Sequence, residues 1–354
     1  MNKLFSWALG NESSRNHQPS EKRLNLALQG GGAHGAFTWG VIDLLLEDGR
    51  VTIEGLSGAS AGALNAVMLA DGLTRGGPQE ARKRLADFWR AASVDGGLSG
   101  VQRRVMEQLL LAHSFASAPM KTWLRSMGIA PSVNPLKINP LKPLIEHFVD
   151  FEAIRQGGRD LFISTTNAQT GDLRIFTAPE LTAEAVMASA ALPSLFRAVE
   201  IDGVDYWDGG YTSNPPLLPF LQTNQSEDVL LVQIFPQHEA TPTSAREIAG
   251  RTSEIAFNAP LLGELRALAA VDRMAEEQGS GAARRLRLHR IALDEAEVAT
   301  DAASRMNNRY EFFQTLHGFG RSAAQRFLAE HFDAIGSRST MDAATEAERE
   351  YASG

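Results

Sequence analysis

Two short apolar runs, each leading into a glycine-rich turn and then a helix-forming segment, constrain the fold of this chain most. LNLALQ at 24–29 leads into GGGAHG and then into a segment with apolar residues at helical spacing that ends at Gly49. VTIEGLSG at 51–58 leads into an Ala- and Leu-rich segment that ends at Gly72. Successive strand–helix units of this kind place parallel strands side by side under helices. The sequence therefore predicts an α/β fold with a central, mostly parallel sheet flanked by helices.

The chain is long enough for one large core with additions at its ends. It has 354 residues, and 44% of them are hydrophobic. We expect a flexible tail at 1–22, a main domain at 23–240, a mainly helical part at 241–338 packed on that domain, and a flexible acidic tail at 339–354. Within the domain, 93–140 has Gly and Pro boundaries and predicts a helical insertion, which suits a lid over a binding pocket and a packing hairpin equally well.

Charge and residue usage exclude several classes of function. A net charge of −8 argues against nucleic-acid binding, which needs a basic face. No apolar run reaches the roughly 18 residues that a membrane-spanning helix requires, and the short apolar patch at 4–9 is barely basic, which favours a solvated tail over a surface anchor. The chain has no cysteine, which removes disulfides, thiolate metal sites and a thiol nucleophile. We expect no metal and no cofactor, and a cytoplasmic location that leaves peripheral contact with a membrane surface open.

The strongest chemical signal is G-A-S-A-G at Gly58–Gly62, which fits the G-x-S-x-G pattern of serine hydrolases. It stands where a predicted strand turns sharply into a predicted helix, and its small residues permit the strained turn that exposes the Ser60 hydroxyl. The N-terminus of the following helix adds positive partial charge beside that hydroxyl. The pattern predicts that Ser60 is a nucleophile.

A second glycine cluster, Gly30–Gly35, stands between the first strand and the first helix. Its backbone N–H groups predict an anion-binding loop, and in a serine hydrolase that anion is the oxygen of the tetrahedral intermediate. Gly30, Gly32 and Gly35 also match the dinucleotide fingerprint G-x-G-x-x-G. That fingerprint calls for an acidic residue at the end of the second strand, where Ser57 and the serine motif stand instead. A nucleotide-binding α/β protein remains the alternative from another class.

A third signal, D-G-G at Asp208–Gly210, follows the predicted strand VDYW. Asp-Gly is a common turn dipeptide, and the pair Asp202-Gly203 shortly before it predicts only a hairpin turn. The residues alone do not distinguish Asp208 from Asp202.

The three motifs, in this order, resemble the signature blocks of the patatin-like phospholipases, a family of lipid acyl hydrolases. ASAALPSLF at 188–196 and YWDGGYTSNPP at 206–216 also resemble bacterial members, and the likeness runs from about Leu24 to about Phe235. The resemblance implies a patatin-like three-layer sandwich and hydrolysis of ester bonds in lipids, as by a phospholipase A or a lipid acyl hydrolase. The expected partner is therefore a lipid or acyl-ester substrate.

The resemblance also implies a catalytic dyad, with Ser60 as nucleophile and Asp208 as proton acceptor. An unperturbed aspartate, with a pKa of about 3.9, is a weak base for a hydroxyl, so burial must raise the pKa of Asp208. The implied oxyanion hole is formed by the backbone of Gly30, Gly31, Gly32 and Ala33, and the remaining motif residues are Gly35, Gly58, Gly62, Gly209 and Gly210.

The chain departs from the family at His34, where Arg or Lys is usual. A partly protonated His34 would keep the supporting positive charge near neutral pH, and we expect a softer pH dependence in consequence.

A conventional Ser–Asp–His esterase is the alternative within the enzyme class. His238, His289 and His317 all follow Ser60 and Asp208 in the chain order of an α/β-hydrolase triad. The dyad hypothesis leaves these three histidines without a catalytic role.

Overall fold

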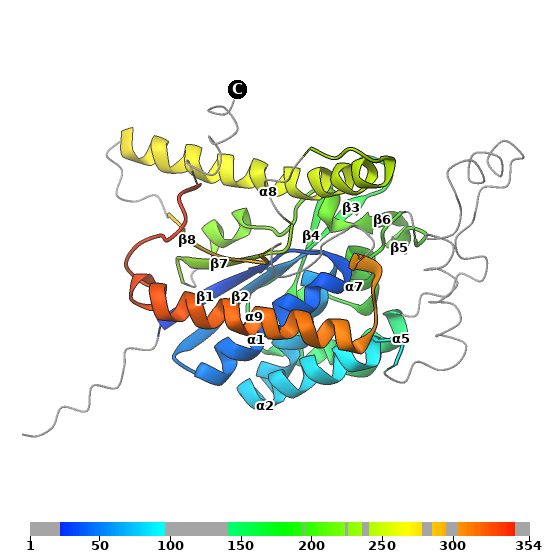
Figure 1. Cartoon of the computed structure of the whole chain (residues 1–354), viewed down its shortest axis with the longest axis horizontal. Coiled ribbons are helices and arrows are strands. Elements are labelled where there is room, and N and C mark those ends of the chain that lie inside the picture. Colours follow the sequence, from blue (N-terminus) through cyan, green and yellow to red (C-terminus); the bar gives the residue numbers. More distant parts are fainter. Residues whose placement is uncertain are drawn as a thin grey trace, which may run out of the picture.

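One mixed sheet of eight strands organises the described part of the chain, with helices on both faces (Figure 1). The computed structural model describes residues 22–95, 141–193, 195–223, 226–235, 241–277, 285–294 and 304–343. The expected α/β fold is confirmed. The expected N-terminal tail and nearly all of the expected insertion lie outside the described residues.

Parallel strands form the centre and one edge of the sheet. In order across the sheet they are β8 (Arg287–Ala292), β7 (Asp228–Gln233), β1 (Lys22–Leu28), β2 (Val51–Gly58) and β3 (Leu161–Asn167). Because these strands are parallel, their carboxyl ends meet at one edge, where Leu28 pairs with Gly58. The glycine-rich turns after β1 and β2 therefore lie next to each other.

Antiparallel strands extend the sheet beyond β3. They are β4 (Leu173–Thr177), β5 (Val199–Ile201) and β6 (Val204–Asp208). On β3, Ile163 pairs with Gly58 of β2, and Thr165, two residues further on, pairs with Asp208 of β6. This register brings Asp208 to the level of the turn that follows β2.

The helices form a layer on each face of the sheet. In Figure 1, α1 (Gly35–Asp48), α2 (Ala61–Ala92) and α9 (Tyr310–His331) lie on one face and α8 (Ala245–Glu277) lies on the other. Beside α2 are α5 (Leu141–Phe148), α6 (Phe151–Gln156) and α7 (Ala183–Ser189). The short 3₁₀ helices are η1 (Gly32–His34), η2 (Ala178–Glu180), η3 (Gly209–Tyr211), η4 (Leu218–Gln222), η5 (Ser304–Met306) and η6 (Phe332–Ala334). Among the described helices, none has the length and apolar character needed to cross a membrane.

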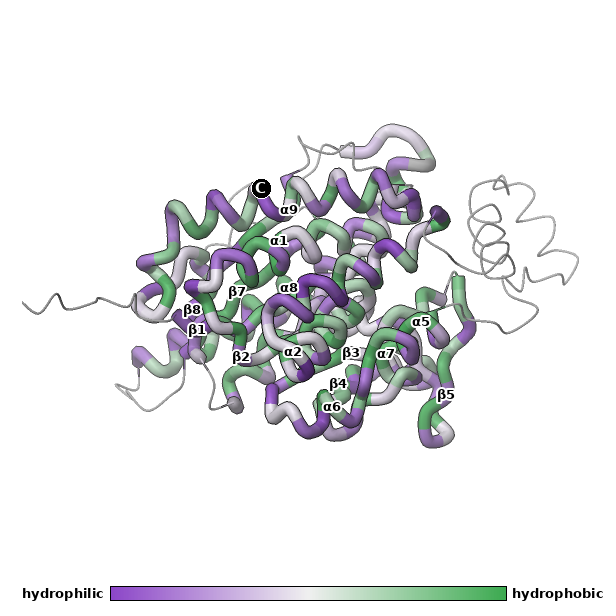
Figure 2. The backbone as a smooth tube through the Cα atoms, turned by 90° about the horizontal axis from the view of Figure 1, so that it is seen from below, coloured by the Kyte–Doolittle hydropathy of each residue, from purple (hydrophilic) through white to green (hydrophobic). Residues whose placement is uncertain are grey.

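Two hydrophobic clusters hold the layers together, and β7 contributes to both. Leu230 and Val232 belong to the larger cluster, with α1, α2 and α9, whereas Val229 and Leu231 belong to the smaller one, with α8. This alternation is the two-residue period of a strand that is covered on both faces. In Figure 2 the tube is green around β7, while purple and green segments alternate along α9.

Two expected boundaries are wrong. The predicted helix end at Gly72 is the interior of α2, which continues to Ala92 and changes direction at Gly77, where φ is +73°. A Cβ at Gly72 would lie 2.4 Å from the Cα of Ala81, so this glycine permits a close approach and does not end the helix.

The second wrong boundary is the start of the C-terminal tail. Residues 339–343 pack against β8, where the N–H groups of Thr340 and Met341 donate to the Leu288 carbonyl at 2.9 and 3.0 Å. Met341 is buried. Burial of the Met341 side chain and hydrogen bonds to the edge strand β8 hold these residues in place, although the residues that follow them in the sequence are acidic.

Candidate active site

Ser60 occupies a strained turn between β2 and α2. Its backbone has φ +53° and ψ −124°, a region that residues with a Cβ rarely adopt. A Cβ at Gly58 would press on Gly62, and a Cβ at Gly62 would collide with the Leu28 carbonyl of β1. The small residues of the motif are therefore required by close packing, and the turn has the form of a nucleophile elbow.

A neighbouring serine holds this elbow in place. The Ser60 amide donates to the Ser189 carbonyl at 3.1 Å and lies 3.0 Å from the Ser189 hydroxyl oxygen. Ser189 is the last residue of α7 and is fully buried. The side chain of Ser60 is nearly covered, with 7% of the residue exposed.

Asp208 ends β6 and is fully buried. Its Oδ1 accepts the Gly210 N–H at 2.8 Å, while Oδ2 has no partner in normal hydrogen-bond geometry among the described residues. Burial raises the pKa of Asp208 to about 7, although the Gly210 amide and the nearby Ser60 side chain both oppose the rise. The carboxyl is thus poised to change protonation near neutral pH, beside the serine.

The two glycines after Asp208 allow other segments to approach the carboxyl. A Cβ at Gly209 would collide with the Ser164 carbonyl of β3, and a Cβ at Gly210 would collide with the Phe257 ring of α8. The D-G-G motif is therefore a packing requirement at the end of β6 and more than a turn.

The glycine loop Gly30–Gly35 lies directly against the nucleophile. A Cβ at Gly30 would press on the Ser60 side chain and the Ala59 carbonyl, and a Cβ at Gly35 would press on Ala61. The loop, the elbow and the end of β6 therefore converge at the carboxyl edge of the sheet.

The amides of this loop differ in their availability. Gly30 donates its N–H to the side-chain oxygen of Asn214 at 2.7 Å, which corrects the expected oxyanion hole because this amide is already engaged. Gly31, Gly32 and Ala33 stand at the start of η1, where helical N–H groups lack intrahelical partners. Within the described ranges no hydrogen bond uses these three amides, so they remain for an anion.

Family comparison agrees with this geometry. The family model described as patatin-like phospholipase matches residues 26–221, which include the elbow, the glycine loop and the D-G-G motif. The chain belongs to the patatin-like phospholipase family. Family membership makes this patatin-like protein a lipid hydrolase. A comparison with curated proteins finds no match.

A comparison with solved structures matches several bacterial proteins at low identity. VipD from Legionella pneumophila is 17% identical, with 85% of this chain and 67% of VipD covered and a TM-score of 0.36. The type III effector ExoU is 14% identical, with 94% of this chain and 60% of ExoU covered and a TM-score of 0.38. The ExoU–SpcU complex of Pseudomonas aeruginosa is 18% identical, with 93% of this chain and 75% of that chain covered and a TM-score of 0.30. The patatin-like chain thus spans about 60% of the ExoU chain, and the family assignment depends on the family model alone.

His34 does not supply the positive charge that was expected of it. It is almost completely buried, and its Nε2 lies 2.8 Å from the Ser304 hydroxyl of η5. Burial, and then the positive charge of Arg305, lower the pKa of His34 to about 3. The expectation of a partly protonated His34 at neutral pH is wrong. The Arg305 guanidinium near His34 is itself ion-paired with Glu254 of α8.

His289 lies in a buried cluster away from Ser60. Its Nε2 is 3.0 Å from Oδ1 of Asp228, and its Nδ1 is 3.0 Å from the Thr340 hydroxyl. Asp228 is the first residue of β7, so this cluster lies toward the amino ends of the parallel strands, whereas Ser60 follows a carboxyl end.

Of the other two candidate triad histidines, the structure describes only His317, which contacts α1. His317 belongs to α9, where its ring stacks on Trp39 with centroids 4.0 Å apart and its Nε2 lies 3.3 Å from Asp43 of α1. His238 lies outside the described residues. Both described histidines of the esterase alternative therefore hold other parts of the molecule.

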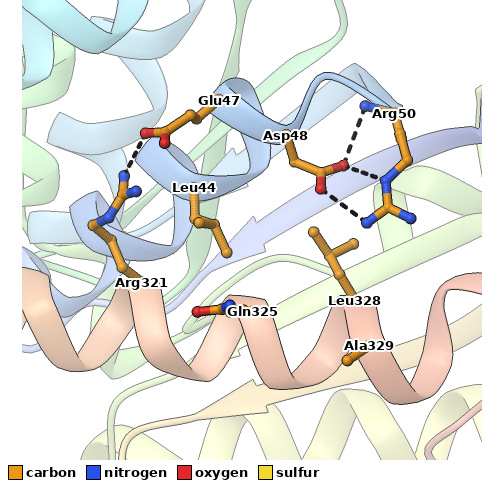
Figure 3. Close-up of a pocket in the computed structure, with 8 residues that line it drawn as sticks. All are labelled: Leu44, Glu47, Asp48, Arg50, Arg321, Gln325, Leu328 and Ala329. Carbon is orange, nitrogen blue, oxygen red and sulfur yellow. Dashed lines mark hydrogen bonds and ion pairs between the residues drawn. The ribbon is translucent and has the colours of Figure 1, made fainter.

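A cavity of about 550 Å³ lies between the C-terminal part of α1 and α9, away from the patatin-like site (Figure 3). Arg50 binds Asp48 at 2.7 Å there, and Arg321 binds Glu47 at 2.9 Å. The N-terminus of α1 is at Gly35 and the cavity begins at Leu44, so roughly 14 Å of helix separates this cavity from the glycine loop. It has no part in the chemistry of Ser60.

Sequence reasoning missed three buried carboxamides beside the glycine loop. The available signals were a polar residue after an apolar strand and two asparagines close to prolines. We interpreted all three residues only as parts of the motif sequences. The three are Gln29, Asn214 and Asn258.

Proposed function

We propose that this patatin-like protein hydrolyses carboxylic ester bonds of lipids, as a phospholipase A or lipid acyl hydrolase, through a dyad of Ser60 and Asp208. The observation that carries the proposal is the proximity of a serine in a strained elbow to a buried aspartate, whose Oδ2 has no partner in normal hydrogen-bond geometry within the described structure. Burial gives this carboxyl a pKa of about 7, which suits a general base at neutral pH.

The proposed acylation step uses all three motifs. Ser60 Oγ transfers its proton to Asp208 and attacks the ester carbonyl carbon, and the amides of Gly31, Gly32 and Ala33 donate to the resulting oxyanion. When the tetrahedral intermediate collapses, the bond to the leaving alcohol breaks and the alcohol oxygen takes the proton from Asp208. The product of this step is an acyl ester of Ser60.

Deacylation reverses the roles of the reacting oxygens. A water molecule gives a proton to Asp208 and its oxygen attacks the acyl carbonyl carbon. Collapse of the second intermediate breaks the bond to Ser60 Oγ, which regains the proton from Asp208. The free carboxylic acid leaves, and the dyad returns to its starting state.

Exposed side chains next to the site support a lipid as the substrate. Tyr211, three residues after Asp208, is 41% exposed and contacts the Phe257 ring of α8 in a tilted arrangement, and Leu218 at the start of η4 is 36% exposed. We propose that these apolar groups meet a lipid surface, in keeping with the expected cytoplasmic location and peripheral membrane contact.

Turnover of a substrate panel tests the proposal. Glycerophospholipids, acylglycerols and simple esters are incubated with the wild-type chain and with Ser60→Ala, and released fatty acid is measured. We expect ester hydrolysis by the wild type and its loss in Ser60→Ala. Equal hydrolysis by both proteins would place the nucleophile elsewhere, and dinucleotide binding without hydrolysis would favour the nucleotide-binding alternative.

A further inference from the structure

A buried group of three carboxamide side chains lies behind the glycine loop. Gln29 and Asn214 are fully buried and Asn258 is 5% exposed. They come from the end of β1, the loop after the D-G-G motif, and α8. A buried amide destabilises the folded state unless its donors and acceptors are satisfied, so a group of three implies a specific task.

Gln29 joins three segments of the chain. Its Oε1 accepts the N–H groups of Ile234 and Phe235 at 2.7 and 2.8 Å, and its Nε2 donates to the Asn258 side chain at 2.9 Å. A longer contact of 3.4 Å leads from Nε2 to the Asn214 carbonyl. The residue that precedes the glycine loop is thus fixed to the segment after β7, to α8 and to the D-G-G loop.

Asn214 makes the contact with the glycine loop itself. Its Oδ1 accepts the Gly30 N–H at 2.7 Å, and its Nδ2 donates to the Phe257 carbonyl of α8 at 3.2 Å. Gly30 immediately precedes Gly31 and Gly32, whose amides are the proposed oxyanion donors. The peptide plane before these donors is therefore oriented by a side chain from another loop.

The glycine loop needs this restraint because of its own sequence. Three successive glycines have wide conformational freedom, and Gly32 already adopts φ +59°. Oxyanion donors act only when they are preorganised toward the developing charge, and a displacement of about 1 Å can cost about 100-fold in rate. The freedom that lets the loop approach Ser60 must be removed by contacts from outside the loop.

We infer that Asn214 is a positioning residue, which acts through Gly30 to hold the oxyanion donors and is itself held by the Gln29–Asn258 pair. The inference goes beyond the dyad and rests on the proposed function, because it assigns the loop the role of binding the oxyanion.

Asn25, which lies on β1, offers a matched control for Asn214. It is also fully buried, its Oδ1 accepts the Gly55 N–H at 2.9 Å, and its Nδ2 donates to the Ser226 carbonyl at 2.6 Å. Asn25 thus repeats the bonding of Asn214, but it lies on β1 roughly 16 Å from Gly30 along the extended chain. A change there removes the same kind of hydrogen bonds without touching the loop.

The experiment compares Asn214→Ala with Asn25→Ala in the full chain. Measurements are the thermal midpoint of unfolding, kcat and KM on an ester from the panel, and the inhibition constant of a trifluoromethyl ketone, which forms a tetrahedral adduct with the nucleophile. We expect similar decreases in thermal midpoint for both variants. For Asn214→Ala we expect kcat to fall about 100-fold, KM to stay within about threefold, and inhibition to weaken by about the factor lost in kcat. Asn25→Ala should keep kcat within about threefold.

A second variant and a spectroscopic measurement keep the test decisive. Asn214→Asp retains an oxygen that accepts the Gly30 N–H but loses the donor to the Phe257 carbonyl, so its kcat should fall less than that of Asn214→Ala. The ¹H–¹⁵N resonances of Gly31 and Gly32 should shift in Asn214→Ala and not in Asn25→Ala. Unchanged loop resonances, or equal losses of kcat in Asn214→Ala and Asn25→Ala, would overturn the positioning role. Shifted resonances in a wild-type protein that hydrolyses no ester would instead overturn the proposed function alone.

Discussion

Two buried aspartates at opposite edges of the sheet, Asp208 at the carboxyl ends of the parallel strands and Asp228 at their amino ends, have opposite electrostatic environments. Asp208 receives one backbone N–H and leaves Oδ2 without a partner among the described residues. Asp228 is bound by His289, by the Arg287 guanidinium and by the Gly336 N–H. Burial raises the pKa of Asp208 to about 7. Burial acts in the same direction on Asp228, but hydrogen bonds from His289, Arg287 and Gly336 outweigh it and hold the pKa of Asp228 well below its usual range.

The difference shows how a chain separates stability from reactivity. A buried carboxylate with a full set of donors stabilises the fold and is a poor base, whereas an underpartnered one destabilises the ionised fold and is a better base. The predictions below test whether the two aspartates divide these tasks as their contacts indicate.

The largest expected effect is the loss of turnover in Asp208→Asn. Asparagine keeps the shape of the side chain but cannot accept the serine proton, so kcat should fall by at least about 1000-fold while the protein stays folded. Asp202→Asn is the matched control, because Asp202 is an exposed residue of an Asp-Gly hairpin turn six positions earlier. Turnover that survives in Asp208→Asn would mean that another group is the base.

The second prediction concerns the well-partnered aspartate. Asp228→Ala leaves His289 without its carboxylate and Arg287 with Glu227 alone, and it should lower the free energy of unfolding by about 3 kcal/mol, with kcat of the folded protein within about threefold of the wild type. Chemical denaturation and turnover measurements check both parts. A large loss of kcat at unchanged stability would assign Asp228 to the chemistry and break the comparison.

The third prediction is a pH-dependent gain in stability from Asp208→Asn. The pKa of Asp208 is higher in the folded protein than the unfolded value of about 3.9, so its favourable contribution is complete below that value and is lost as the pH rises through about 7. The variant should therefore be more stable than the wild type at pH 8 by on the order of 4 kcal/mol, and the gain should disappear near pH 4. A gain that is independent of pH would show that Asp208 does not titrate in this range.

The smallest expected effect is that of His34→Gln on the pH dependence of kcat/KM, which tests whether Asp208 is the titrating group. The rate constant kcat/KM should rise about tenfold per pH unit below about 7 and level off above it, because the ionised form of Asp208 is the base. His34→Gln should leave the midpoint unchanged, since His34 is neutral throughout this range. A midpoint that moves by a full pH unit in His34→Gln would restore the histidine as a titrating partner of the site.

The sequence predicted the fold class, because apolar runs, glycine turns and strand ends are local features, whereas the pairing of Asp208 with Ser60 was implied only by the family resemblance. It did not predict β5, which is only three residues long, nor the continuation of α2 through Gly72, where the glycine serves a contact with Ala81. Contacts between distant segments decide these points.

The same limit applied to the candidate site. Ser60 and Asp208 stand in recognisable motifs, but the engagement of the Gly30 amide depends on Asn214, 184 positions away. The neutral state of His34 depends on burial under η5 and on Arg305, and both come from a segment far along the chain. Charge state and amide availability are properties of the assembled structure, so local patterns could not reveal them.

Mapping the adduct of a fluorophosphonate ester by mass spectrometry tests the central claim most directly. The reagent reacts with an activated serine, and we expect a single modified residue, Ser60, with labelling retained in Asp228→Ala and absent in Ser60→Ala. Labelling of another residue in the wild type, or equal labelling of Ser60→Ala, would contradict the account of Ser60 as the nucleophile of this site.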